Sequence, residues 1–177
     1  MTGDSYWELV EQIATRRKGE EVFNDSTAHA SVLIERMFAH ANISMCVFSR
    51  GLDKGVYDRD AVLSEVGKFL ADSSRKLKVL VENGDLAHYE DSKFFGEVRG
   101  LPNVKLHVVD PDYIQGLKMN FTIMDNDCFR IEPDKNSHEA IAVFGDSKTG
   151  ERYLKFFDEL WSKSELLDGD DACAEVD

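Results

Sequence analysis

The chain has 177 residues and a mass of 20.0 kDa, which suits one ordinary domain. Hydrophobic residues make up 42% and aromatic residues 10% of the sequence, so the chain can build a core and is not a wholly disordered protein. It carries 21 Lys and Arg against 34 Asp and Glu, a formal net charge of −13. A surface this acidic repels phosphate backbones, which argues against a general nucleic-acid binder.

The cysteines and the apolar runs indicate where such a chain would reside. Three cysteines without a Cys-x-x-Cys pair fit reduced thiols better than a disulfide framework or a zinc site. No apolar run approaches the ~18 residues of a membrane span, and the first residues lack the basic and apolar regions of a signal peptide. We therefore expect a soluble, cytoplasmic protein with no membrane contact, no metal and no cofactor.

The two ends differ in character from the middle of the chain. In residues 1–22, Trp7, Val10, Ile13 and Ala14 recur at helical spacing, which predicts an N-terminal helical extension. Residues 165–177 hold six acids and no base, as is typical of an acidic flexible tail. The sequence thus predicts a single domain over residues 23–164 with an extension at each end.

Within that domain, helical and strand patterns alternate. A helix is predicted from residue 25 or 26 to 40, followed by a strand at 43–49, a helix at 61–71, a strand at 76–81, a helix at 91–99 and a strand at 104–109. This order implies parallel strands with right-handed crossovers. Shorter strands at 120–124, 128–132 and 140–144 and a final helix at 151–163 follow. The predicted fold class is α/β, with a mixed, mostly parallel sheet flanked by helices on both faces.

Several familiar site motifs fail on their spacing. The segment Gly145-Asp-Ser-Lys-Thr-Gly150 lacks the Gly-Lys-Ser/Thr of a phosphate loop and is better explained as a loop that leads into a helix. His138-Glu139 has no second histidine four residues on, so it is not a zinc-protease helix.

Three segments carry a resemblance to a known family. They are Phe121-Thr-Ile-Met-Asp125, Asn136-Ser-His-Glu-Ala-Ile-Ala-Val-Phe144 and Phe156-Phe-Asp-Glu-Leu-Trp161. With the order of elements, they make residues 23–164 similar to one half-domain of the phospholipase D-like superfamily. The resemblance implies a single phospholipase D-like domain, in which a strand carries the family's His-x-Lys-x4-Asp motif.

The chain differs from that motif at the two positions that carry out the family's chemistry. Counting back from Asp125, Asn120 takes the position of the family's lysine and Lys118 that of its histidine. In the family the histidine attacks phosphorus and the lysine neutralises phosphate oxygens. Protonated Lys118 is a poor nucleophile at pH 7 and Asn120 carries no charge. We therefore predict no catalytic residues, and a catalytically inactive protein that acts as a binding or regulatory subunit. The resemblance suggests a setting in a bacterial defence or mobile-element system.

Alternatives remain open for the altered site. The candidates for a remodelled binding cleft are Lys118, Asn120, Asp125, Arg130, Glu132, His138 and Glu139. The cleft could bind a small anionic ligand at Lys118 and Arg130, or a diverged phosphodiesterase could use His138 or His107 as its nucleophile. Otherwise Arg130 and Glu132 simply pair across strands on a solvated face, where such a pair contributes about 0–1 kcal/mol.

The resemblance also bears on partners. Active family members with one motif in each chain generally pair two chains to complete the cleft. We therefore expect a C2 homodimer with Lys118 and Asn120 near its axis, together with a protein partner.

Overall fold

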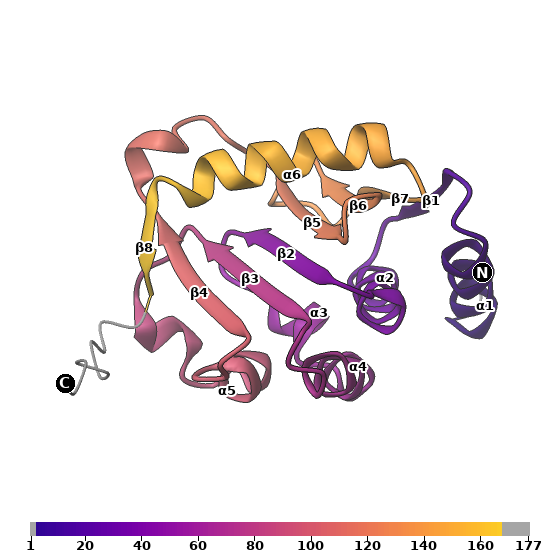
Figure 1. The fold of residues 1–177 in the computed structure, drawn as a ribbon, viewed down its shortest axis with the longest axis horizontal. Helices are drawn as coiled ribbons and strands as arrows, with labels where there is room; N and C mark the ends of the chain where they lie inside the picture. Colours follow the sequence, from indigo (N-terminus) through magenta and orange to yellow (C-terminus); the bar gives the residue numbers. More distant parts are fainter. Residues whose placement is uncertain (1–2, 168–177) are drawn as a thin grey trace.

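The computed structural model describes residues 3–167 and places their eight strands in one mixed sheet of order β1-β7-β6-β5-β2-β3-β4-β8 (Figure 1). The strands are β1 (Glu20–Asn24), β2 (Ser44–Ser49), β3 (Lys76–Val81), β4 (Val104–Val109), β5 (Asn120–Met124), β6 (Cys128–Glu132), β7 (Ala140–Phe144) and β8 (Ser164–Leu166). The helices are α1 (Gly3–Arg16), α2 (Thr27–His40), α3 (Lys54–Tyr57), α4 (Asp60–Leu70), α5 (Lys93–Val98) and α6 (Ser147–Trp161), with short 3₁₀ turns η1 (Leu86–Tyr89) and η2 (Pro111–Tyr113).

The predicted α/β class, with one mixed sheet between helices, is confirmed, but parallel pairing is limited to three neighbouring strands. β2, β3 and β4 pair in parallel, as the alternating pattern predicted. β5, β6, β7 and β1 add antiparallel on one side, and β8 adds antiparallel to β4 on the other. Most pairings in the described part of the chain are therefore antiparallel, because only the helical crossovers require parallel strands.

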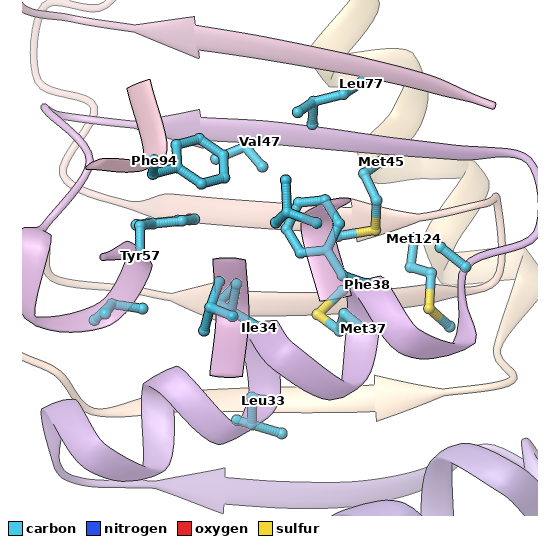
Figure 2. Packing of buried hydrophobic residues seen from close by; sticks show 14 of the residues in the cluster. Leu33, Ile34, Met37, Phe38, Met45, Val47, Tyr57, Leu77, Phe94 and Met124 are labelled. Carbon is cyan, nitrogen blue, oxygen red and sulfur yellow. The ribbon is translucent and has the colours of Figure 1, made fainter. Parts of the chain in front are cut away.

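Each face of the sheet has its own core. Helices α1 to α5 cover one face and α6 covers the other (Figure 1). On the first face, Phe38 and Met37 of α2 pack against Met45 and Val47 of β2 (Figure 2). On the second, Phe121 of β5 is fully buried against the aromatic stripe of α6. Alternation along each strand sends successive side chains to these two cores.

The two ends are more closely joined to the domain than the sequence predicted. In α1, Val10 and Ile13 are buried, and the Trp7 indole donates a hydrogen bond to Glu35 of α2. β1 begins at Glu20, inside the predicted extension, and β8 runs past the predicted boundary at residue 164. The predicted tail is described only as far as Leu167, and its remaining residues lie outside the described part of the chain.

The glycines of the segment that resembled a phosphate loop have structural tasks. Gly145 has a φ of 95°, and a Cβ there would collide with the carbonyl of Arg17. A Cβ at Gly150 would collide with the carbonyl of Asn126, in the turn between β5 and β6. Both glycines therefore permit close approach of backbone to backbone where α6 begins.

Candidate ligand cleft

A cavity of about 510 Å³ opens where β2 and β3 end, β5 begins and β6 ends. This volume lies within the usual range for small-molecule sites, and the carboxyl ends of parallel strands are a common place for them. We call it the cleft. Its ionisable side chains include Arg50, Asp53, Glu82, His88, Arg130, Glu132, Lys135 and His138.

Strand register explains why four polar residues share the floor of the cleft. Asn120 pairs with Glu132, and Thr122 pairs with Arg130, across the antiparallel strands β5 and β6. Residues two apart on a strand point to the same face, so these four side chains point away from Phe121 and α6. Three of the residues predicted for a cleft, Asn120, Arg130 and Glu132, are thus brought together.

Arg130 and Glu132 form a buried ion pair, with residue exposures of only 4% and 7%. Arg130 Nη2 lies 2.9 Å from Glu132 Oε2, and Asn120 Nδ2 donates to Glu132 Oε1 at 2.8 Å. Arg130 Nε donates to Oδ1 of Asn24 at 3.2 Å, and the Asn24 amide donates in turn to the His138 carbonyl. The prediction of a pair across strands on a solvated face is therefore wrong: both residues lie on β6, and both are buried.

A second ion pair closes the side of the cleft near β3. Lys135 Nζ lies 2.7 Å from Glu82 Oε2 and also donates to the Leu117 carbonyl at 2.9 Å. Both side chains are largely buried. This lysine fixes the loop after β6 against the end of β3.

The remaining ionisable groups are more open. The Arg50 guanidinium donates to Oδ1 of Asn136 at 3.0 Å and, among the described residues, has no carboxylate partner. His138 Nε2 lies 3.7 Å from Asp53 Oδ2, and His88 Nε2 lies 3.0 Å from the Gly51 carbonyl. The cleft therefore presents one cation without a carboxylate partner beside two imidazoles.

Tyr57 of α3 lies beneath these groups. Burial raises the pKa of its hydroxyl to about 12, while its hydrogen bond with Thr122 acts in the opposite direction. The phenol therefore stays protonated at neutral pH and contributes a neutral donor to the cleft wall.

Other predicted site residues lie elsewhere. Asp125 sits at the far end of β5 from Asn120, where its carboxylate accepts hydrogen bonds from the N–H groups of Asn42, Ile43 and Ser44 and pairs with Arg17. Burial alone would raise the pKa of Asp125, but these hydrogen bonds outweigh it and hold the pKa below the usual value. Asp125 therefore anchors the start of β2 and does not line the cleft.

Three further candidates are also separated from the cleft. Lys118 is not among the residues that line it; its carbonyl accepts a hydrogen bond from the Lys135 N–H at 2.7 Å. Glu139 lines a neighbouring groove. His107 lies on β4, stacked on Trp161 at 3.9 Å and hydrogen-bonded to Ser164, so of the two histidines considered as nucleophiles only His138 lies in the cleft.

Sequence reasoning missed the cleft residues that directly follow the parallel strands. Arg50 comes directly after β2, and Glu82 directly after β3. A signal was present, because the carboxyl ends of parallel strands meet at one edge of the sheet. Lys135 carried no such signal, since its partner Glu82 lies 53 positions away in sequence.

Two further features concern the metal-ligating and thiol side chains of the described residues. Among the side chains that the structure describes, those of residues 5–167, no three or more of His, Cys, Asp or Glu are grouped to hold a metal ion. Burial raises the pKa of the free thiols Cys46 and Cys128 to about 12, so both remain protonated. Over the same residues, no helix is both long and apolar enough to cross a membrane.

Residues 25–168 match a protein family described as "Domain of unknown function (DUF7931)". The chain belongs to this family. The matched residues of this DUF7931 protein run from just after β1 to the end of β8, so they include nearly the whole sheet and every cleft residue. No curated protein matches the chain.

Solved structures show that the DUF7931 protein has the fold of the phospholipase D family, as the resemblance implied. NucT from Helicobacter pylori aligns with a TM-score of 0.59 at 13% identity, over 84% of this chain and 99% of its own. Nuc from Salmonella typhimurium, a phospholipase D family member, aligns at 0.55 and 14% identity, over 83% of this chain and 98% of its own.

A larger protein also shares the fold. The archaeal chromatin protein TrmBL2 aligns with a TM-score of 0.61 at 15% identity, over 92% of this chain and 61% of its own. The DUF7931 protein therefore spans about three-fifths of TrmBL2 and nearly all of the two Nuc proteins. At these identities the likeness extends to the fold alone.

Proposed function

We propose that this protein is a catalytically inactive phospholipase D-like domain that acts as a binding or regulatory subunit, with the cleft as its site for a small anionic ligand. The observation that carries the proposal is the buried network around Asn120. Counting back from Asp125, this residue takes the predicted position of the family's lysine. Its side chain accepts a hydrogen bond from the backbone N–H of Arg50 at 3.0 Å and donates one to Glu132 at 2.8 Å. The Asn120 amide therefore forms hydrogen bonds within the protein and is not free to bind a phosphate oxygen.

The charges of the cleft support an anionic ligand. Its three cations, Arg50, Arg130 and Lys135, are matched in number by Asp53, Glu82 and Glu132. In a chain of net charge −13, such a balanced site has the locally higher potential. Arg130 and Lys135 already have buried carboxylate partners. We therefore expect Arg50 to pair with the negative charge of the ligand, in place of Lys118 and Arg130, which the sequence suggested.

Ligand binding is tested by thermal unfolding against a panel of nucleotides, inorganic phosphate and small carboxylates. A ligand at 100 times its dissociation constant stabilises the fold by about 2.7 kcal/mol, which raises the Tm of a chain this size by about 5–11 °C. The shift should be lost in Arg50→Gln and kept in the matched variant Arg59→Gln, because Arg59 directly precedes α4 and does not line the cleft. No shift with any compound, or an equal shift in Arg50→Gln, would remove the support for this site.

One observation favours a second function, a diverged phosphodiesterase. His138 lies in the cleft with Arg130, and its Nε2 is 3.7 Å from the Asp53 carboxylate, a group that could orient the imidazole once the two approach to hydrogen-bond distance. We therefore assay hydrolysis of bis-p-nitrophenyl phosphate and single-stranded DNA, with and without divalent metal, using wild-type protein, His138→Ala and His107→Ala. If the domain is catalytically inactive, as proposed, no sample should hydrolyse either substrate. Turnover lost only in His138→Ala would establish the second function instead.

We also propose that two copies form a C2 homodimer with Lys118 and Asn120 near the axis. The support is the resemblance to family members that pair two chains, and the position of Asn120 among the residues that line the cleft. Sedimentation at micromolar concentration should give twice the 20.0 kDa chain mass. A sedimenting monomer would contradict the proposal.

A further inference from the structure

A second concave surface lies beside the cleft, on the other side of the loop between β6 and β7. It encloses about 910 Å³ between the end of β1, the start of α2 and that loop. We call it the acidic groove. Its lining includes three apolar and three acidic residues: Phe23, Pro133, Ile141, Asp25, Asp134 and Glu139.

The apolar part of the groove lies at the edge of the sheet. β1 is the last strand on its side, and Phe23 stands opposite Ile141 of β7. Phe23 is 68% exposed, more than any other large hydrophobic residue in the described chain. Its backbone is nevertheless fixed, because its carbonyl accepts a hydrogen bond from the buried Tyr6 hydroxyl at 3.0 Å. An exposed aromatic side chain on a rigid strand is a typical interface anchor.

The polar part of the groove is acidic. Its lining includes the carboxylates of Asp25, Asp134 and Glu139 but no lysine or arginine. The Asp25 carboxylate lies 3.3 Å from His29, and among the described residues the Asp134 carboxylate accepts hydrogen bonds only from Asn136. Among the side chains that the structure describes, the Glu139 carboxylate has no hydrogen-bond or ion-pair partner. These groups are available to a cation.

We propose that the acidic groove docks a basic segment of a partner protein, with an arginine or lysine among the three carboxylates and an apolar side chain against Phe23 and Ile141. Charge complementarity selects this occupant over a second copy of the chain. In a two-fold symmetric contact the same patch faces itself, so Asp134 and Glu139 would oppose like charges. The proposal rests on the proposed regulatory role for the existence of a partner, and is independent of ligand binding in the cleft.

The test is selection of binders from a displayed library of random twelve-residue peptides on the full 177-residue protein. The selected peptides should carry arginine or lysine beside a leucine or an aromatic residue, and binding should weaken with added salt. Phe23→Ser should weaken binding by more than about fivefold. Asp134→Asn/Glu139→Gln should weaken it about three- to tenfold.

Matched variants serve as controls. Ile43 is 66% exposed outside the groove, so Ile43→Ser should leave binding unchanged. Glu151→Gln/Glu159→Gln removes two carboxylates from a different acidic surface, on α6, and should also have no effect. Thermal unfolding of each variant checks that the fold is intact.

Three outcomes of the peptide experiment would overturn the proposal. They are a selection that enriches no peptide, one that enriches neutral or acidic peptides, and binding that survives both groove variants. A dimer that Phe23→Ser dissociates would assign the groove to a second copy and would also overturn it. None of these results bears on the ligand panel for the cleft, so the two proposals fail separately.

Discussion

Replacing Glu132 by alanine tests directly whether the Arg130–Glu132 pair is buried. The Glu132 carboxylate accepts from Arg130 at 2.9 Å and from Asn120 at 2.8 Å, and the two charged side chains are 5% and 9% exposed. Glu132→Ala leaves the Arg130 guanidinium in the sheet with only Asn24 as a partner. Removal of one member of a buried ion pair costs about 3–5 kcal/mol, because the remaining charge stays desolvated.

The measurement is urea unfolding at pH 7, followed by circular dichroism. For a chain of this size the expected loss corresponds to a Tm lower by about 6–20 °C. Glu20→Ala serves as the control, because it breaks the exposed Arg16–Glu20 pair and should cost only about 0–1 kcal/mol. The double variant Arg130→Met/Glu132→Leu removes both charges and should be more stable than Glu132→Ala.

A loss below about 1 kcal/mol in Glu132→Ala would refute this reasoning. It would mean that water reaches Arg130, as it would on a solvated face. The cleft would then lack the fixed floor on which the proposed ligand site depends.

Three other substitutions test other parts of the fold by unfolding. Phe121→Ala should cost about 3–5 kcal/mol, since its ring packs against Phe48 and Phe157; a cost below 1 kcal/mol would contradict the packing. Asp125→Asn should cost about 1.5–3 kcal/mol at pH 7. The folded-state pKa of Asp125 is lowered, so its contribution is present above about pH 4 and is lost as the pH falls further; the variant should show a smaller loss in acid. Burial, with Lys105 and Lys78 nearby, lowers the pKa of His107 below 6.5. The unfolded chain therefore binds that proton more readily, stability declines as the pH falls below about 6.5, and His107→Gln should reduce the decline between pH 7.5 and 5.5; an unchanged slope would contradict it.

The sequence predicted the elements that are long or strongly periodic. The strands at 76–81 and 104–109 have the predicted bounds, and α2 begins after the capping side chain of Ser26. β1 and β8 were missed for a physical reason. β8 has only three residues, and both edge strands are defined by pairing with β7 or β4, far away in sequence. Local propensity carries no record of such partners.

Two glycines also show that local sequence does not reveal contacts between distant segments. The segment from Gly145 to Gly150 suggested a loop before the last helix, but α6 begins at Ser147 and Gly150 lies within its first turn. Their need for close contact with Arg17 and Asn126 was invisible, because each contact joins segments from different parts of the chain. A glycine in a sequence marks freedom of the backbone but does not say which neighbour requires it.

In the candidate site, too, local features were predictable from the sequence and distant contacts were not. Alternation along β5 and β6 was enough to place Asn120, Arg130 and Glu132 on one face, because side-chain direction follows position in a strand. Their burial was not predictable, since charged residues lie on the surface unless they are paired. The pairing depends on Asn24, which is 106 positions from Arg130 and belongs to a strand that the sequence did not indicate. Because Asn24 also holds the loop at His138 that separates the cleft from the acidic groove, the missed strand β1 supports both proposed sites.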